Sequence, residues 1–153
     1  MASQADYLSA FNSLILPSIS KVQRLSSIIL ESSIKPHEIT LAEFRIVGLL
    51  MGEEQGFSQK QLAQKLSISS PSLSVSISSL EKKHWLQRIN DEHDLRIKRV
   101  RIHPDADFSG IAHLITLLES QVTKGISKKD LLVTQKVLSK MMININQLKS
   151  TEK

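Results

Sequence analysis

The fold is decided by residues 57–102, which read FSQKQLAQKLSISSPSLSVSISSLEKKHWLQRINDEHDLRIKRVRI. Two short runs with apolar residues at helical spacing come first, and residues 67–69 form the turn between them. The period then changes, because residues 85–89 begin a strand and residues 98–103 alternate between apolar and basic side chains. Residues 91–96 lie between the two strands as a polar tip. The stretch therefore predicts a pair of helices followed by a β-hairpin.

Local signals place the starts of the two helices. Ser58 and Gln61 have the spacing of a capping box, in which each side chain binds the backbone amide of the other residue. Ser70 is the predicted cap of the second helix, with Pro71 at its first position, where a missing amide does no harm. The buried stripe of this helix is predicted to be Leu73, Ile77 and Leu80. Such a helix fits the major groove of DNA and a basic hairpin beside it can reach a minor groove, which is the order of a winged helix-turn-helix.

Long apolar helices are expected on both sides of this region. Residues 5–33 carry apolar side chains at helical spacing, and we expect either a kink or a helix start near Pro17. Thr40 and Glu43 form another capping box, which opens the first helix of the central domain. After a break at residues 104–107, two further helices with apolar stripes are expected to run to the C-terminal end.

These elements predict a mainly α protein with a small β-wing. Residues 37–103 are expected to form the winged helix-turn-helix DNA-binding region, and residues 1–36 and 104–153 a helical dimerisation region. A long helix must bury its apolar face against something. A second copy of the same terminal helices is the simplest partner, so we expect a symmetric homodimer.

Composition narrows the class of protein. The chain has 153 residues, a formal charge of +5 and a pI near 9.6, so an anionic partner is favoured. Residues 82–101 hold seven Lys/Arg against three Asp/Glu, so the positive charge is concentrated in and beside the hairpin. With no cysteine, disulfides and thiolate metal sites within the chain are excluded. No apolar run is long enough for a membrane span and no basic signal peptide is visible, so the cytoplasm is the expected location.

The chain resembles the MarR family of bacterial transcription regulators over roughly residues 8–148. The matching residues are Phe57-Ser58-x-x-Gln61-Leu62-Ala63-x-x-Leu66, Ser69 through Lys83, Arg88, and Asp91-x-x-Asp94-x-Arg96-x-x-x-Val100-x-Ile102. The wing departs from the usual family pattern, because Glu92 replaces a proline and Leu95 replaces an arginine. His84 stands where the family commonly has a glycine, and a positive φ at this position would be tolerated by histidine better than by most residues.

The resemblance implies a dimeric regulator, with repressor as the expected type, whose two recognition helices bind a pseudo-palindromic operator in double-stranded DNA. It also implies that Arg96, oriented by Asp94, probes a minor groove. Small aromatic compounds are the effector class that it suggests, bound between the dimer helices and the winged domain. Since the chain has no cysteine, it is not one of the family's thiol-oxidation sensors.

The candidate DNA-binding residues lie on the second helix, on the strands and at the tip. They are Ser70, Ser72, Val75, Ser76, Ser79, Lys82, Arg88, Asp94, Arg96, Lys98 and Arg99. The serine hydroxyls can bind phosphates and many base edges, and Val75 can contact a thymine methyl. The plainer interpretation is a solvated polar helix face, with an exposed Asp94–Arg96 ion pair that contributes little.

Other chemistries find little support. The five histidines show no metal-ligand spacing, and His103-x-Asp105-x-Asp107 is better explained as a turn beside Pro104. No nucleophile elbow, phosphate-binding loop or paired-carboxylate motif is present, so we expect no enzyme, cofactor or metal. The competing hypothesis is a winged-helix adaptor or antagonist that binds proteins and has lost sequence-specific DNA binding.

Overall fold

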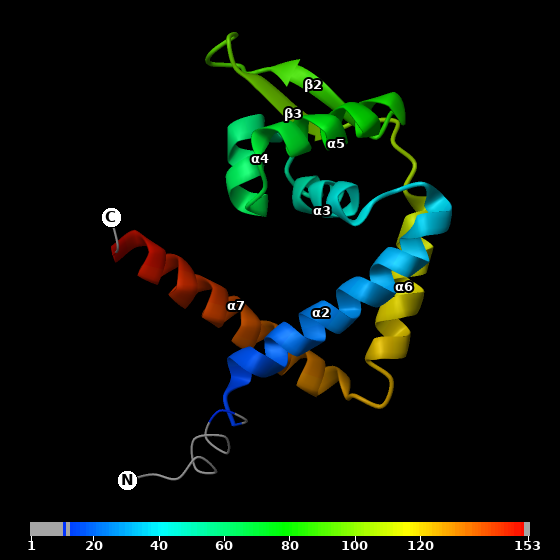
Figure 1. Ribbon diagram of the computed structural model, residues 1–153, viewed down its shortest axis with the longest axis vertical. Helices are drawn as coiled ribbons and strands as arrows, with labels where there is room; N and C mark the ends of the chain where they lie inside the picture. The colour runs from blue at the N-terminus through cyan, green and yellow to red at the C-terminus, as the bar shows by residue number, and fades with distance from the viewer. Residues whose placement is uncertain (1–10, 12, 152–153) are drawn as a thin grey trace. The chain divides into compact units, whose positions relative to one another are not determined.

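The computed structural model describes residues 11 and 13–151, which fall into two compact units, up to Leu114 and from Ile115 onward. The elements are α2 (Ile15–Ile34), η1 (Lys35–His37), α3 (Leu41–Leu50), β1 (Phe57–Ser58), α4 (Gln59–Leu66), α5 (Ser70–Lys82), β2 (Leu86–Asn90), β3 (Lys98–Ile102), α6 (Ser109–Val122) and α7 (Lys128–Thr151) (Figure 1). The mainly α architecture with a small β-wing is therefore confirmed.

Helix α2 begins at Ile15, so Pro17 lies in its first turn, where its missing amide has no intrahelical partner to lose. This confirms the helix start and removes the predicted kink. The apolar positions predicted before residue 11 lie outside the described residues. At its other end α2 continues into η1, and Glu38 follows in the left-handed conformation with φ 55°.

Both predicted capping boxes are present. The Thr40 hydroxyl accepts from the Glu43 amide at 3.1 Å, and the Glu43 carboxylate accepts from the Thr40 amide at 2.8 Å. Ser58 and Gln61 exchange the same two bonds at the start of α4. The predicted cap of α5 was wrong by one residue: Ser69 is the cap, and Ser70 is already helical. The reason is that Ser67 adopts the left-handed conformation and closes the turn after α4, which leaves Ser69 extended at the position a cap requires.

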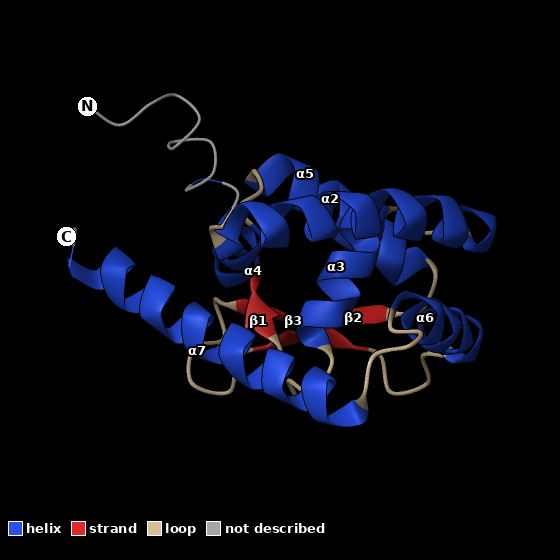
Figure 2. Cartoon of the chain, turned by 90° about the horizontal axis from the view of Figure 1, so that it is seen from below, coloured by secondary structure: helices blue, strands red, loops and turns tan. Residues whose placement is uncertain are grey.

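A three-stranded antiparallel sheet in the order β1-β3-β2 carries the wing (Figure 2). Strands β2 and β3 are the predicted hairpin, with Arg88 opposite Val100. Strand β1 was not predicted; it pairs Phe57 with Val100. The turn before it needs Gly56, because φ is 64° there and a Cβ would lie 2.1 Å from the carbonyl oxygen of Val100.

The core of the first unit lies between α3, α4, α5 and the sheet. The predicted stripe of α5, Leu73, Ile77 and Leu80, is fully buried within it. Its other buried members are Ile46, Val47, Leu50, Leu62, Leu86 and Val100. Trp85 packs edge-on against Phe108, with ring centroids 5.1 Å apart, and so fixes the segment that follows α5. His84, which follows α5, has φ 56°, a conformation that histidine tolerates better than most residues other than glycine.

The second unit contains the end of α6 and all of α7. Gly125, with φ 82°, lies in the turn between them, and Ser127 caps α7 by accepting from the Asp130 amide at 3.1 Å. Among the described residues, no helix is both long enough and apolar enough to cross a membrane.

Candidate nucleic-acid interface

The outward face of α5 is the first part of the candidate interface. Val75 is its most prominent apolar residue, with 72% of its surface exposed. A shallow hollow beside it is lined by Ser74, Val75, Ser78, Ser79 and Lys82. The face therefore offers several hydroxyls, one branched apolar side chain and one cation, which is the chemistry expected to meet base edges and a phosphate.

The serines of this face are not all placed as predicted. Ser70 and Ser72 are exposed at the start of α5, but the Ser72 hydroxyl lies 2.9 Å from that of the cap Ser69. Ser76 is half-buried beside the core stripe. Ser74 and Ser78 are exposed and were missed. At about 100° per residue, Ser78 lies nearly opposite the buried stripe and Ser76 lies beside it. The helical period alone would therefore have predicted that Ser78 is exposed and Ser76 half-buried.

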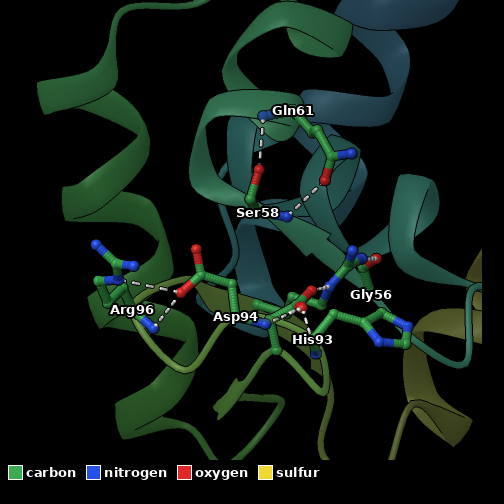
Figure 3. A network of polar contacts seen from close by, with 8 residues as sticks. Gly56, Ser58, Gln61, His93, Asp94 and Arg96 are labelled. Atoms are coloured by element: carbon green, nitrogen blue, oxygen red, sulfur yellow. Dashed lines mark hydrogen bonds and ion pairs between the residues drawn. The ribbon is translucent and has the colours of Figure 1, made fainter.

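The wing is anchored at its base by Asp91. Its carboxylate accepts from the amides of His93 at 2.9 Å and Asp94 at 3.0 Å and pairs with the Arg99 guanidinium (Figure 3). The hydrogen bond from Arg99 is the largest cause that lowers the pKa of Asp91, to about 2, and the two amides lower it further. Arg99 also donates from Nη1 to the carbonyl oxygen of Gly56 at 3.0 Å. The base of the wing is thus bonded to the turn before β1.

Asp94 and Arg96 form the pair expected at the tip. The Arg96 Nε lies 3.5 Å from Asp94 Oδ1, and the Arg96 amide donates to the same oxygen at 3.0 Å (Figure 3). The Arg96 side chain is 94% exposed. A carboxylate beside a nearly free guanidinium limits the conformations that the guanidinium must lose on binding.

The remaining cations of the predicted site differ in their exposure and in whether a carboxylate already binds them. Lys82 is exposed at the end of α5, and Lys98 is exposed on β3, where it donates to the Asn90 side chain. Arg88 is paired with Glu81 at 2.6 Å. Asp91 holds Arg99 in the base of the wing, so Arg99 does not project at the tip. The guanidinium of Arg96, in contrast, is exposed to solvent.

A second buried carboxylate lies under α5. Glu43 is only 3% exposed, and its Oε2 lies 3.3 Å from Lys83 Nζ. Burial raises the pKa of Glu43, but hydrogen bonds from Ser79 and from the Thr40 amide, together with the charge of Lys83, outweigh it, so the pKa lies below its usual value. Ser79 therefore serves partly to bind Glu43. Sequence spacing gave no signal for this cluster, because Glu43 and Lys83 are forty residues apart.

The motif His103-x-Asp105 is a turn, as expected. The Asp105 amide donates to His103 Nδ1 at 3.2 Å, which occupies one ring nitrogen. Across the described part of the chain, no three His, Asp or Glu side chains gather as a metal site would require.

Comparison with known proteins agrees with this geometry. Residues 37–97 match the sequence model of the MarR family. The transcriptional regulator PA3341 is 20% identical with a TM-score of 0.74, and the match covers 88% of this chain and 99% of that one. Streptococcus pneumoniae FabT in complex with DNA is 16% identical with a TM-score of 0.63, covering 88% and 96%. The S. aureus MepR–DNA complex is 19% identical with a TM-score of 0.60, covering 83% and 93%.

At these identities the solved structures establish the fold alone, which is the winged-helix fold that they share with this chain. The family match covers the part of the chain that contains α3, β1, α4, α5, β2 and the tip of the wing, and it ends before β3. Residues 37–97, which form most of the winged helix-turn-helix, are therefore similar in sequence to the MarR family.

Proposed function

We propose that the protein is a dimeric transcription regulator that binds double-stranded DNA sequence-specifically. One observation carries the proposal: Arg96 stands almost fully exposed, oriented by Asp94, at the tip of a wing whose base is fixed by Asp91. An exposed cation on a rigid tip contributes little to folding, whereas it suits a minor groove.

In this proposal α5 enters the major groove, with Val75 against a thymine methyl and Ser74 and Ser78 near base edges or phosphates. Ser70 and Ser72 lie at the start of the helix, where they can bind phosphate, and Ser76 and Ser79 flank the contact surface. Lys82, Arg88 and Lys98 supply phosphate contacts, while Arg99 acts mainly by holding the wing. The FabT and MepR structures contain DNA, which supports this placement by likeness of fold.

The terminal helices are the proposed dimerisation region, residues 1–36 and 104–153. On α2, exposed apolar side chains include Val22, Leu25, Ile28 and Ile29. On α7, they include Leu132, Val133, Val137 and Ile143. Apolar surface on this scale marks an interaction face, and a second copy of the chain is the partner that we propose.

A two-fold dimer presents two copies of α5, so the operator should be pseudo-palindromic with half-sites about 10 bp apart. Repression is the proposed mode of action, and a small aromatic compound the proposed effector. Both rest on the family resemblance alone.

Selection of bound duplexes from a random pool, followed by anisotropy titrations, tests the proposal. We expect enrichment of a pseudo-palindrome and tight binding that weakens steeply with salt. Enrichment of single asymmetric half-sites would contradict the dimeric arrangement. No enrichment would contradict sequence-specific binding.

One observation favours the adaptor hypothesis as a second candidate. Apart from Lys82 at its last position, α5 contains none of the side chains that read a guanine or an adenine through two hydrogen bonds, which are arginine, lysine, asparagine and glutamine. An adaptor would bind duplex DNA weakly and without sequence preference. The same titrations, made with selected and scrambled duplexes, separate the two hypotheses.

A further inference from the structure

We propose that Glu43 and Lys83 are positioning residues that fix the orientation of α5 and thereby determine how well the protein distinguishes its operator from other DNA. The inference rests on the proposed function, because it concerns the helix that is placed in the major groove. Neither residue is proposed to touch the DNA.

The Glu43 carboxylate joins two helices. It belongs to the first turn of α3, where it accepts from the Thr40 amide at 2.8 Å. It accepts a hydrogen bond from Ser79 of α5, and the ammonium of Lys83, the residue that caps the C-terminal end of α5, lies 3.3 Å away. Among the described residues, Glu43 and Asp91 are the two polar side chains that are buried. The first lies under the recognition helix and the second under the wing, so each DNA-facing element has a buried carboxylate at its base.

Lys83 extends the connection to the segment that follows α2. Its ammonium also donates to the carbonyl oxygen of Glu38, the left-handed residue after η1. The C-terminal end of α5 is therefore bonded to α3 and to the turn between η1 and α3. A displacement of that turn would move Lys83 and, with it, the end of the recognition helix.

Apolar packing alone defines the orientation of α5 less sharply than these bonds do. Leu73, Ile77 and Leu80 exclude water, but their contacts are non-directional. A buried ion pair is a weak source of stability, since the loss of hydration offsets the attraction between the charges. Its geometry is nevertheless discrete, so its expected contribution is a unique orientation of the helix.

The pair also keeps one cation away from DNA. With Glu43 ionised, the half-exposed Lys83 ammonium is held between the Glu43 carboxylate and the Glu38 carbonyl oxygen. In Glu43→Gln it loses its charged partner and keeps only the carbonyl oxygen, so a phosphate can compete for it. Loss of the pair should therefore weaken operator binding and strengthen non-specific binding. A general loss of folded protein would instead weaken both in proportion.

The test compares full-length wild type, Glu43→Gln and Lys83→Gln on the duplex selected from a random pool and on a scrambled duplex of equal length. Both variants should lose at least about fivefold in the ratio of the two affinities, the low end of the effect of one mismatched base pair. For the scrambled duplex, Glu43→Gln should steepen the salt slope by about 0.9 through the released ammonium. Lys83→Gln should not.

Thr40→Ala is the matched control, because it removes the hydroxyl cap of α3 but leaves the backbone amide that binds Glu43. It should lower the melting temperature and keep the wild-type affinity ratio. Unchanged ratios in both test variants, or equal losses on the two duplexes, would overturn the proposal.

Trp85 gives a readout that needs no DNA. It is the single tryptophan, it follows α5 by three residues, and it packs on Phe108. Its near-ultraviolet circular dichroism should change in Glu43→Gln and Lys83→Gln but not in Thr40→Ala. A spectrum that is the same in all four proteins would contradict the inference even if the wild type bound no duplex selectively. Absence of selective binding by the wild type would contradict only the proposed function.

Discussion

Replacement of Arg96 by alanine tests the proposed interface most directly. The side chain is 94% exposed and its nearest carboxylate oxygen is 3.5 Å away, so its removal leaves no buried group unpaired. The melting temperature should therefore stay at the wild-type value. Operator affinity should fall markedly, because the guanidinium at the tip is the group proposed to enter a minor groove.

The expected size follows from the number of charges removed. Loss of one phosphate-neutralising cation per protomer reduces the slope of log affinity against log salt by about 0.9. Between about 50 and 200 mM salt, the affinity of Arg96→Ala should therefore fall by a factor that is roughly 3.5-fold smaller per protomer than the fall of the wild-type affinity. Anisotropy titrations of the selected duplex at several salt concentrations measure both the affinity and the slope.

Two variants serve as comparisons. Asp94→Ala should reduce the operator affinity less than Arg96→Ala does. It removes the carboxylate that orients the Arg96 guanidinium, but it also removes a negative charge that repels the DNA phosphates. Lys98→Ala removes an exposed cation from the strand and not from the tip, so it should weaken operator and scrambled duplex about equally. Binding by Arg96→Ala equal to that of wild type across the salt range would remove the wing from the mechanism.

Four further outcomes are expected. The pKa of Asp91 is lowered from 3.8 to about 2, so the stability that depends on its ionised form is complete above about pH 4 and is lost as pH falls toward 2; melting curves of wild type and Asp91→Asn should converge in that range. Arg99→Ala should lower the melting temperature, unlike Arg96→Ala, because Asp91 loses its guanidinium partner. Replacing the contacted thymine by uracil should weaken wild-type binding about fourfold, as for one buried methylene, and should leave Val75→Ala unaffected. Deleting residues 128–153 should abolish the dimer in light-scattering measurements, and a soluble folded dimer after this deletion would refute the proposed role of the terminal helices.

The features predicted correctly from the sequence depend on short spacing. The capping boxes at Thr40 and Ser58 each depend on two side chains that are only three positions apart. The buried stripe of α5 follows from the helical period. Even here the cap of α5 was misplaced by one residue. Ser67, Ser69 and Ser70 all lie near the turn and could each have capped the helix, and the left-handed conformation of Ser67 decides among them.

The features missed depend on contacts between distant residues. Strand β1 is two residues long and exists through its pairing with β3. No local pattern specifies so short a strand. The bond from Arg99 to the Gly56 carbonyl spans 43 residues, and the pair of Lys83 with Glu43 spans 40. Their side chains look like ordinary surface charges in the sequence, and only the folded chain shows which of them are held.

This distinction changes the electrostatic argument for DNA binding. Of the seven Lys/Arg within residues 82–101, four form ion pairs in the structure, through Lys83, Arg88, Arg96 and Arg99. Lys83 and Arg99 are committed to buried carboxylates, so counting residues overstates the cations that can meet phosphates. Their proposed contribution to DNA binding is instead geometric, because Lys83 is bonded under α5 and Arg99 under the wing. Five cations remain, Lys82, Arg88, Arg96, Lys98 and Arg101, of which Arg88 is also paired with Glu81. In the proposed function, this small set can discriminate between sequences only if the buried pairs hold α5 and the tip in a fixed relation within the domain.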